Sequence, residues 1–118
     1  TEVIVGSVND ATFGPTLMFG LGGIFVEVMK DVTFKVAPID EATALDMQSE
    51  IKSYKILEGA RGEEPRDQKA LADVLAHYSY MVYDLRDEIA ESDANPVIVY
   101  EEGKGVAVVD ARIILTKK

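Results

Sequence analysis

Cysteine is absent from this 118-residue sequence, and histidine occurs once. The absence of cysteine excludes disulfides, thiolate metal sites and cysteine nucleophiles, and it is compatible with the cytoplasmic location that we expect. No apolar run reaches the about 20 residues of a membrane helix, and no signal-like segment opens the chain, so we expect no membrane partner. Basic residues are scarce, 12 against 21 acidic ones. The resulting negative field repels phosphate polymers, so nucleic acid is not an expected partner.

The length of the chain predicts a single domain that spans residues 1–118. With 47% apolar residues, a chain of this size buries roughly two-thirds of the surface that its unfolded form exposes. The sequence begins at Thr1, without a methionine and inside a run typical of a strand. We therefore expect it to be a piece of a longer polypeptide.

The first third of the sequence has the pattern of β-strands. Residues 2–8, EVIVGSV, are rich in valine and isoleucine and end at Asn9 and Asp10, which are typical of turns. Residues 15–38 predict two or three further strands interrupted by glycines. Asp40 then is a candidate N-cap for a first helix.

A second helix is predicted over residues 68–86, where apolar side chains recur at steps of three and four residues. Residues 53–66, which contain two glycines and a proline, are predicted to form a loop before it. The recurring apolar positions are Leu71, Val74, Leu75, Tyr78, Met81, Val82 and Leu85. This helix should pack one face on the sheet.

The last part of the sequence predicts a β-hairpin. Residues 96–100 and 105–116 have strand patterns, and the EEGKG segment between them suits a turn. Pro96, which lacks an N–H, is predicted to begin the first strand, with Asn95 at the end of the sheet. The whole order of elements indicates an α+β fold, with helices on a largely antiparallel sheet.

Asn95 and Asp110 are predicted to lie opposite each other in this hairpin. With a turn near residues 102–104, antiparallel pairing places their Cβ atoms about 5 Å apart. An amide oxygen and a carboxylate oxygen, completed by waters and phosphate oxygens, form the kind of ligand set that Mg²⁺ prefers. The alternative is a hydrogen bond between the two side chains that only fastens the hairpin.

Three separated blocks of the sequence resemble, in the same order, the C-terminal subdomain of the ATP-grasp domain in ADP-forming acetyl-CoA synthetases. The blocks are EVIVGSVNDATFGPTLMFGLGGIFVEVMKDVTFKVAPI, LEGARGEEPRD, and NPVIVY followed by VVDARI. The family is related to the β-subunit of succinyl-CoA synthetase. The resemblance implies a mostly antiparallel sheet with two helices on one face. It also implies reversible conversion of acyl-CoA, ADP and phosphate into acid, CoA and ATP through a phosphohistidine.

The resemblance assigns roles to individual residues. In the family, the Asn of the Asn-Pro pair and the Asp of the next strand hold Mg²⁺ on the phosphates of ATP or ADP, and these match Asn95 and Asp110. The acidic residue that steadies the phosphohistidine in the succinyl-CoA relatives matches Asp93. Glu2 is similar in position to a glutamate that accepts hydrogen bonds from ribose hydroxyls. Its alternative is a solvated terminal residue.

Four further residues are candidates on chemical grounds. Gly22 and Gly23 are candidates to present backbone N–H groups to a phosphate as a cofactor-binding nest, or to form a plain turn. Glu27 is a candidate catalytic carboxylate facing the same site, or a solvent-face residue of an alternating strand. Arg61 is a candidate phosphate contact, or a solvated loop residue.

His77 is predicted to be structural rather than phosphorylated. It lies off the apolar stripe of the second helix, near Asp73 and Asp84, and no glycine-rich loop adjoins it. In the family that the chain resembles, the phosphohistidine belongs to a CoA-binding domain or an α-subunit, which is therefore an expected partner.

The resemblance covers one half of a site that forms between two subdomains. The other half, with its phosphate-gripping lysine, is expected before Thr1, so the chain alone is predicted to fold without being active. Three functions remain open: a part of an ADP-forming acyl-CoA ligase, a regulatory module of a protein acetyltransferase, and an acidic interaction domain. Retention of Asn95, Asp110 and Glu27 favours the first.

Overall fold

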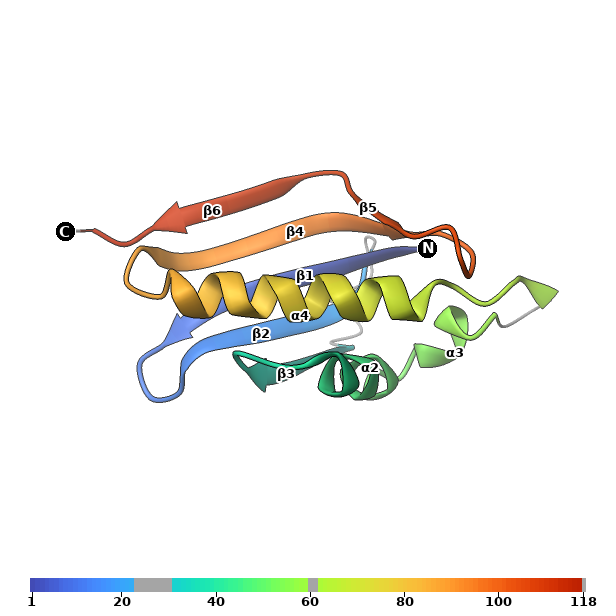
Figure 1. The fold of residues 1–118 in the computed structure, drawn as a ribbon, viewed down its shortest axis with the longest axis horizontal. Helices are drawn as coiled ribbons and strands as arrows, with labels where there is room; N and C mark the ends of the chain where they lie inside the picture. The colour runs from blue at the N-terminus through green and yellow to red at the C-terminus, as the bar shows by residue number, and fades with distance from the viewer. Residues whose placement is uncertain (23–30, 60–61, 118) are drawn as a thin grey trace.

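The computed structural model describes residues 1–22, 31–59 and 62–117. They form an α+β fold in which helices cover one face of an antiparallel sheet (Figure 1). The strands are β1 (Glu2–Asp10), β2 (Gly14–Leu21), β3 (Val32–Val36), β4 (Ile89–Val99), β5 (Val106–Val108) and β6 (Ala111–Leu115). The helices are α2 (Glu41–Ser49), α3 (Tyr54–Leu57) and α4 (Gln68–Asp84). None of the helices in these ranges is long and apolar enough to cross a membrane.

The sheet has the strand order β3-β2-β1-β4, and β5 and β6 both pair with the outer side of β4. Every described pair of strands is antiparallel. The two central strands, β1 and β4, are distant in sequence, since Ser7 and Ser92 share a hydrogen bond across 85 residues. The long helix α4 runs along the sheet, with α2 beside it (Figure 1).

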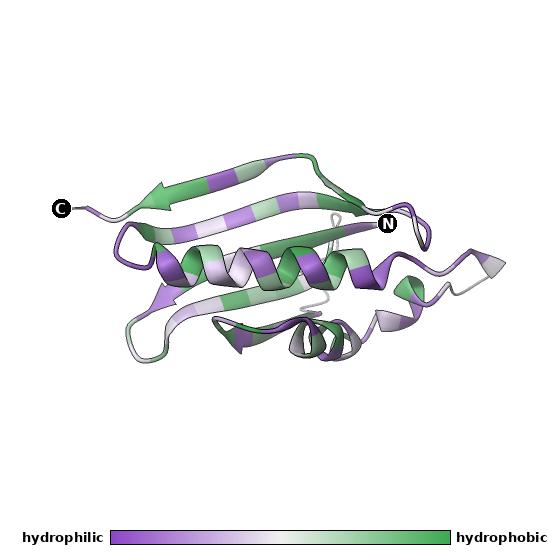
Figure 2. Ribbon diagram, in the orientation of Figure 1, coloured by the Kyte–Doolittle hydropathy of each residue, from purple (hydrophilic) through white to green (hydrophobic). Residues whose placement is uncertain are grey.

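The core lies between the helices and one face of the sheet. Alternate residues of a strand point to opposite faces, and those on the helix side of β1 and β2 are fully buried, as are the facing residues of α4. This set comprises Val3, Val5, Leu17, Phe19, Leu71 and Leu75. In Figure 2 the hydrophobic stretch of β1 stands out, whereas β4 mixes hydrophobic and hydrophilic residues. The predicted apolar stripe of α4 thus faces the core through Leu71, Leu75 and Val82, whereas Leu85 lies just past the end of the helix and is 43% exposed.

The other face of the sheet carries exposed apolar side chains. Val8 and Phe34 are 48% and 57% exposed. Within the described ranges, no helix packs on this side, which we call the open face. Its residues are thus free to contact a ligand or another part of a longer chain.

Both predicted helices are present, but the loop predicted between them needs a correction. Helix α4 is confirmed and ends at Asp84, and Asp40 caps α2 as predicted, since its Oδ1 accepts from the Thr43 N–H at 2.7 Å. The predicted loop 53–66, however, contains the four-residue helix α3. Its Leu57 is fully buried, so packing against the core fixes a turn that the local sequence does not indicate.

Strand β4 begins earlier than predicted. It starts at Ile89 rather than Pro96, so the acidic run before Asn95 lies inside the sheet. Pairing with β1 on one side and β6 on the other holds this polar segment in the strand. The second hairpin strand is divided into β5 and β6, with Val109 and Asp110 between them.

Candidate functional site

Asp93 faces the open side of the sheet. Its neighbours Ser92 and Ala94 are buried toward α4, and alternation along the strand turns Asp93 the other way. The Ser92 hydroxyl is hydrogen-bonded to Tyr78 of α4 at 2.5 Å and to Ser7 of β1 at 2.6 Å. These two hydrogen bonds link β4 to β1 and to α4 next to Asp93. Burial there raises the pKa of Tyr78, which keeps its hydroxyl neutral.

Asn95 and Pro96 form a bulge in β4. Against β1, Ala94 pairs with Val5 and Val97 pairs with Val3, so the two bulge residues oppose Ile4 alone. Ala94 and Val97 are both buried on the helix side, which leaves the bulge residues on the open side. The bulge also explains how proline fits a central strand, since a bulge interrupts the ladder where its missing N–H would donate.

The predicted pairing of Asn95 with Asp110 is confirmed in the backbone. The Asn95 N–H donates to the Asp110 carbonyl at 3.0 Å, and the Val109 N–H donates to the Pro96 carbonyl at 3.1 Å. Both Asn95 and Asp110 are exposed. The Asp110 Oδ1 accepts from the Ala111 N–H at 2.9 Å. Two residues with oxygen-bearing side chains therefore lie opposite each other, Asn95 in β4 and Asp110 in the link between β5 and β6.

The donor types at this pair fit a magnesium ion. An amide oxygen and a carboxylate oxygen are hard ligands, and Mg²⁺ usually takes only one or two groups from the protein, with waters and phosphates completing its shell. Across the described part of the chain, no three His, Asp or Glu side chains converge as a closed metal cage. The pair thus suits a metal that is shared with a nucleotide.

A second polar pair lies next to the first on the same ladder. Asp93 on β4 is directly opposite Arg112 on β6, and the Arg112 Nη2 donates to the Asp93 Oδ2 at 3.1 Å. The side chains of Asp93 and Arg112 are 34% and 66% exposed. Two residues along each strand separate this pair from Asn95 and Asp110, a distance of about 7 Å.

Sequence analysis did not identify Arg112 as a site residue. The signal was present, because the hairpin register that pairs Asn95 with Asp110 also pairs Asp93 with Arg112. Beside this pair the open face is hollowed, and Gly6 of β1 forms part of the floor. A Cβ on Gly6 would lie 3.3 Å from the Ser92 carbonyl oxygen and in ordinary contact with the Asp93 Cβ at 3.8 Å, so a side chain here would take up part of the hollow.

Glu2 and Gly22 lie together at one end of the open face. The Gly22 N–H donates to the Glu2 carbonyl at 2.7 Å, and a Cβ on Gly22 would meet the Glu2 backbone at 3.0 Å. Gly22 therefore permits close approach of β1 and β2. Its N–H already has a partner, so a bound phosphate would have to replace that bond. Gly23, Glu27 and Arg61 lie outside the described residues.

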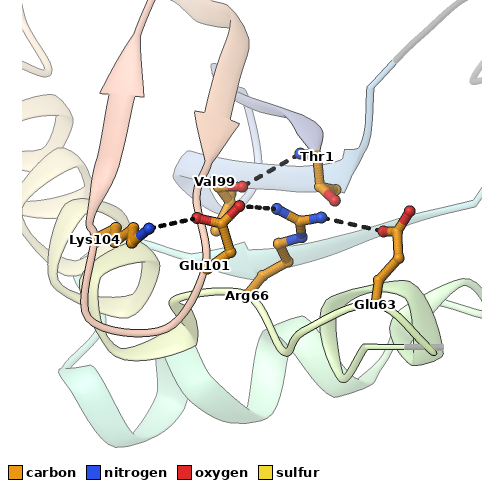
Figure 3. Close-up of polar contacts among 6 residues, drawn as sticks. All are labelled: Thr1, Glu63, Arg66, Val99, Glu101 and Lys104. Atoms are coloured by element: carbon orange, nitrogen blue, oxygen red, sulfur yellow. Dashed lines mark hydrogen bonds and ion pairs between the residues drawn. The ribbon is translucent and has the colours of Figure 1, made fainter.

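An ion-pair cluster braces this end of the sheet (Figure 3). Arg66 lies between two carboxylates, with 3.1 Å from its Nη2 to the Glu63 Oε2 and 3.7 Å from its Nη1 to the Glu101 Oε1. Lys104 approaches the second oxygen of Glu101 at 3.6 Å. The Thr1 nitrogen donates to the Val99 carbonyl at 3.3 Å, which keeps the start of β1 beside β4. The Thr1 contact thereby holds the start of β1, which carries Glu2, against β4.

His77 is remote from these residues. It lies on α4, which packs on the helix side of the sheet, and its side chain is 78% exposed. Its Nδ1 lies 2.8 Å from the Asp73 carbonyl, and this hydrogen bond, with the nearby Asp73 carboxylate, raises the pKa of His77. The histidine is therefore on the opposite face from Asp93.

A family model described as an ATP-grasp domain matches residues 1–115. The chain belongs to the ATP-grasp family. It is 59% identical over 114 residues to the β-subunit of acetate–CoA ligase (ADP-forming) II of Pyrococcus furiosus, covering 97% of this chain and 48% of that protein. It is 49% identical to the 4-hydroxybutyrate–CoA ligase (ADP-forming) of Nitrosopumilus maritimus, covering 95% and 16%.

A solved structure similar to this chain carries ligands. The dinucleotide-forming acetyl-coenzyme A synthetase 1 of Ca. Korarchaeum cryptofilum, in complex with coenzyme A and Mg-AMPPCP, superposes with a TM-score of 0.90 at 51% identity. The match covers 98% of this chain and 53% of that one, and the phosphohistidine segment of that protein points towards its nucleotide binding site. This ATP-grasp chain spans about half the length of the Pyrococcus furiosus β-subunit.

Proposed function

We propose that this chain is the Mg-nucleotide-binding half of an ADP-forming acyl-CoA ligase. The enzyme interconverts acyl-CoA, ADP and phosphate with the free acid, CoA and ATP. The observation that carries the proposal is the order of polar residues on the open face. Glu2 stands at one end, the Asn95–Asp110 pair follows, and Asp93 comes next along β4. This is the order of ribose, metal-bound phosphates and phosphoryl acceptor along a bound nucleotide.

Each side chain has a defined task in this proposal. The Glu2 carboxylate accepts hydrogen bonds from ribose hydroxyls. Asn95 and Asp110 would hold Mg²⁺, which supplies neutralisation of charge on the phosphate oxygens. Asp93 accepts a hydrogen bond from the histidine that a CoA-binding domain or partner α-subunit brings to the open face. Glu27 remains a candidate second catalytic carboxylate. The proposal also includes a cytoplasmic location.

The phosphoryl-transfer step conserves atoms and charge. One imidazole nitrogen of the partner histidine attacks the γ-phosphorus with its lone pair, so that a P–N bond forms. The bond from the γ-phosphorus to the β–γ bridging oxygen breaks, and ADP leaves with that electron pair. The proton on the second ring nitrogen stays in place, hydrogen-bonded to Asp93, whose negative charge opposes the positive charge on the ring.

The test uses the complete ligase and transfer of labelled phosphate from ATP to the protein. Asp110→Asn removes the carboxylate charge with almost no change of volume, and we expect labelling to fall by about 100-fold or more, because charge neutralisation by a metal contributes several kcal/mol. Circular dichroism checks that the fold is retained. His77→Ala, on the opposite face, is the control and should label normally. Normal labelling of Asp110→Asn would contradict the assignment.

A further inference from the structure

We infer that Arg112 binds the phosphoryl group during transfer, and that Asp93 holds its guanidinium on the open face until that group arrives. The inference rests on the proposed function and adds a residue to it. It starts from the ladder between β4 and β6, where Asp93 and Arg112 directly oppose each other at 3.1 Å.

The charges of the open face single out Arg112. Of the described residues that line the hollow beside Asp93, Arg112 alone carries a positive charge, while Glu91 and Asp93 are acidic. Lys35 of the opposite edge strand is turned to the helix side, where it pairs with Glu50 at 2.8 Å. A phosphoryl group that enters the hollow is therefore repelled by carboxylates and attracted by Arg112.

The geometry of the ion pair leaves Arg112 able to take a second partner. Its described contact to Asp93 uses Nη2, whereas a guanidinium has five N–H donors. The side chain is 66% exposed, so the remaining donors face solvent on the open side. Guanidinium groups bind phosphate oxygens in a bidentate manner. Arg112 can therefore contact phosphoryl oxygens while Asp93 remains beside it.

The position along the ladder fits the direction of transfer. The proposed metal-binding pair, Asn95 and Asp110, lies two residues along the ladder from Arg112, a distance of about 7 Å. A phosphoryl group that leaves the metal-bound nucleotide for a histidine at Asp93 passes between these two pairs. As the P–O bond to ADP breaks and the P–N bond forms, Arg112 stabilises the charge on the phosphoryl oxygens.

A purely structural ion pair predicts a different result. Exposed pairs of this kind contribute little to the stability of a fold, so loss of a purely structural pair leaves nucleotide binding unchanged. The two readings separate when ligands with and without a terminal phosphoryl group are compared. Mg-AMPPCP carries that group and Mg-ADP does not.

The experiment measures the dissociation constants of both ligands by titration calorimetry on the complete ligase. For Arg112→Gln we expect about tenfold weaker binding of Mg-AMPPCP, which is about 1.4 kcal/mol, because charge-assisted hydrogen bonds to the terminal phosphoryl group are lost. The dissociation constant of Mg-ADP should stay unchanged. Arg112→Lys should bind Mg-AMPPCP more tightly than Arg112→Gln but less tightly than the wild type, because lysine keeps the positive charge but cannot make the bidentate contact. Lys35→Gln removes a comparable ion pair on the helix side and is the matched control.

The outcomes separate this inference from the proposed function. If the wild type binds both ligands and Arg112→Gln weakens neither, or weakens both equally, Arg112 does not bind the phosphoryl group. If the wild type binds neither ligand, the proposed function itself fails and the inference with it. Selective loss of Mg-AMPPCP, with partial recovery in Arg112→Lys and a normal melting temperature, supports both.

Discussion

Asp67 joins α4 to the β4–β5 hairpin, and its replacement by alanine is expected to destabilise the chain strongly. The carboxylate is buried, with 8% of the residue exposed. Its Oδ1 accepts from the Ala70 N–H at 3.1 Å and caps α4. Its Oδ2 accepts from the N–H groups of Gly103 and Gly105 at 3.1 and 2.8 Å. One side chain therefore satisfies three backbone donors.

The cost of Asp67→Ala follows from these three bonds. Loss of the N-cap costs about 1 kcal/mol. Each hairpin N–H loses a bond to a charged acceptor, and since the turn is partly open to water we take about 1 kcal/mol for each, below the usual range. The sum of about 3 kcal/mol corresponds to a fall of about 12 °C in melting temperature for a chain of this size.

Glycine geometry makes the hairpin dependent on this carboxylate. Gly103 and Gly105 have φ values of +87° and +83°, which orient their N–H groups toward Asp67. Such φ values are accessible to glycine at little cost. Without the acceptor, the turn loses what holds it against α4, so hydrogen exchange in residues 101–105 should increase more than in β1.

The assay is urea denaturation of the 118-residue chain, followed by circular dichroism. Asp73→Ala removes an exposed acidic side chain from the same helix and should change stability by less than about 0.5 kcal/mol. A loss below 1 kcal/mol for Asp67→Ala, or a loss no larger than that of Asp73→Ala, would refute the reasoning.

The same carboxylate gives a pH dependence. Hydrogen bonds from the backbone of Ala70, Gly105 and Gly103 lower the pKa of Asp67 in the folded state. Its contribution is therefore complete above the unfolded pKa of about 3.9 and is lost as the pH falls through the lower folded value. The stability difference between wild type and Asp67→Ala should thus be constant near neutral pH and shrink in acid below about pH 4.

Two further substitutions test the packing of α4. Leu75→Ala removes a fully buried side chain and should cost about 2–5 kcal/mol in urea denaturation, whereas Leu45→Ala, at a position 38% exposed, should cost much less. Ser79→Ala leaves the buried Ile39 N–H without the hydroxyl that accepts its bond at 2.9 Å, at a cost of about 1–3 kcal/mol. Ser49→Ala, at an exposed helix position, is its control, and equal losses for the two serine variants would contradict this account.

Much of the candidate site could be predicted because its pairing is local. The turn and the strands on either side of it lie within one continuous segment, so the register that pairs Asn95 with Asp110 follows from the position of the turn. Helix α4 could be predicted for a similar reason, since the apolar period that indicates it and its length are both visible in one continuous segment. The roles of individual residues came from the resemblance, because spacing alone left a plain hydrogen bond as an alternative.

Tertiary structure alone decided how β4 is used. Its first residues are polar and carry no strand pattern, yet they lie in the sheet because β1, more than 80 residues away in sequence, pairs with one side of them. Which face of the sheet the helices cover was also undetermined, and it decides that Asp93 is open and Ser92 buried. Pairing and layering of distant segments depend on contacts that no local pattern records, and these contacts decide that the Asp93–Arg112 pair lies on the open face.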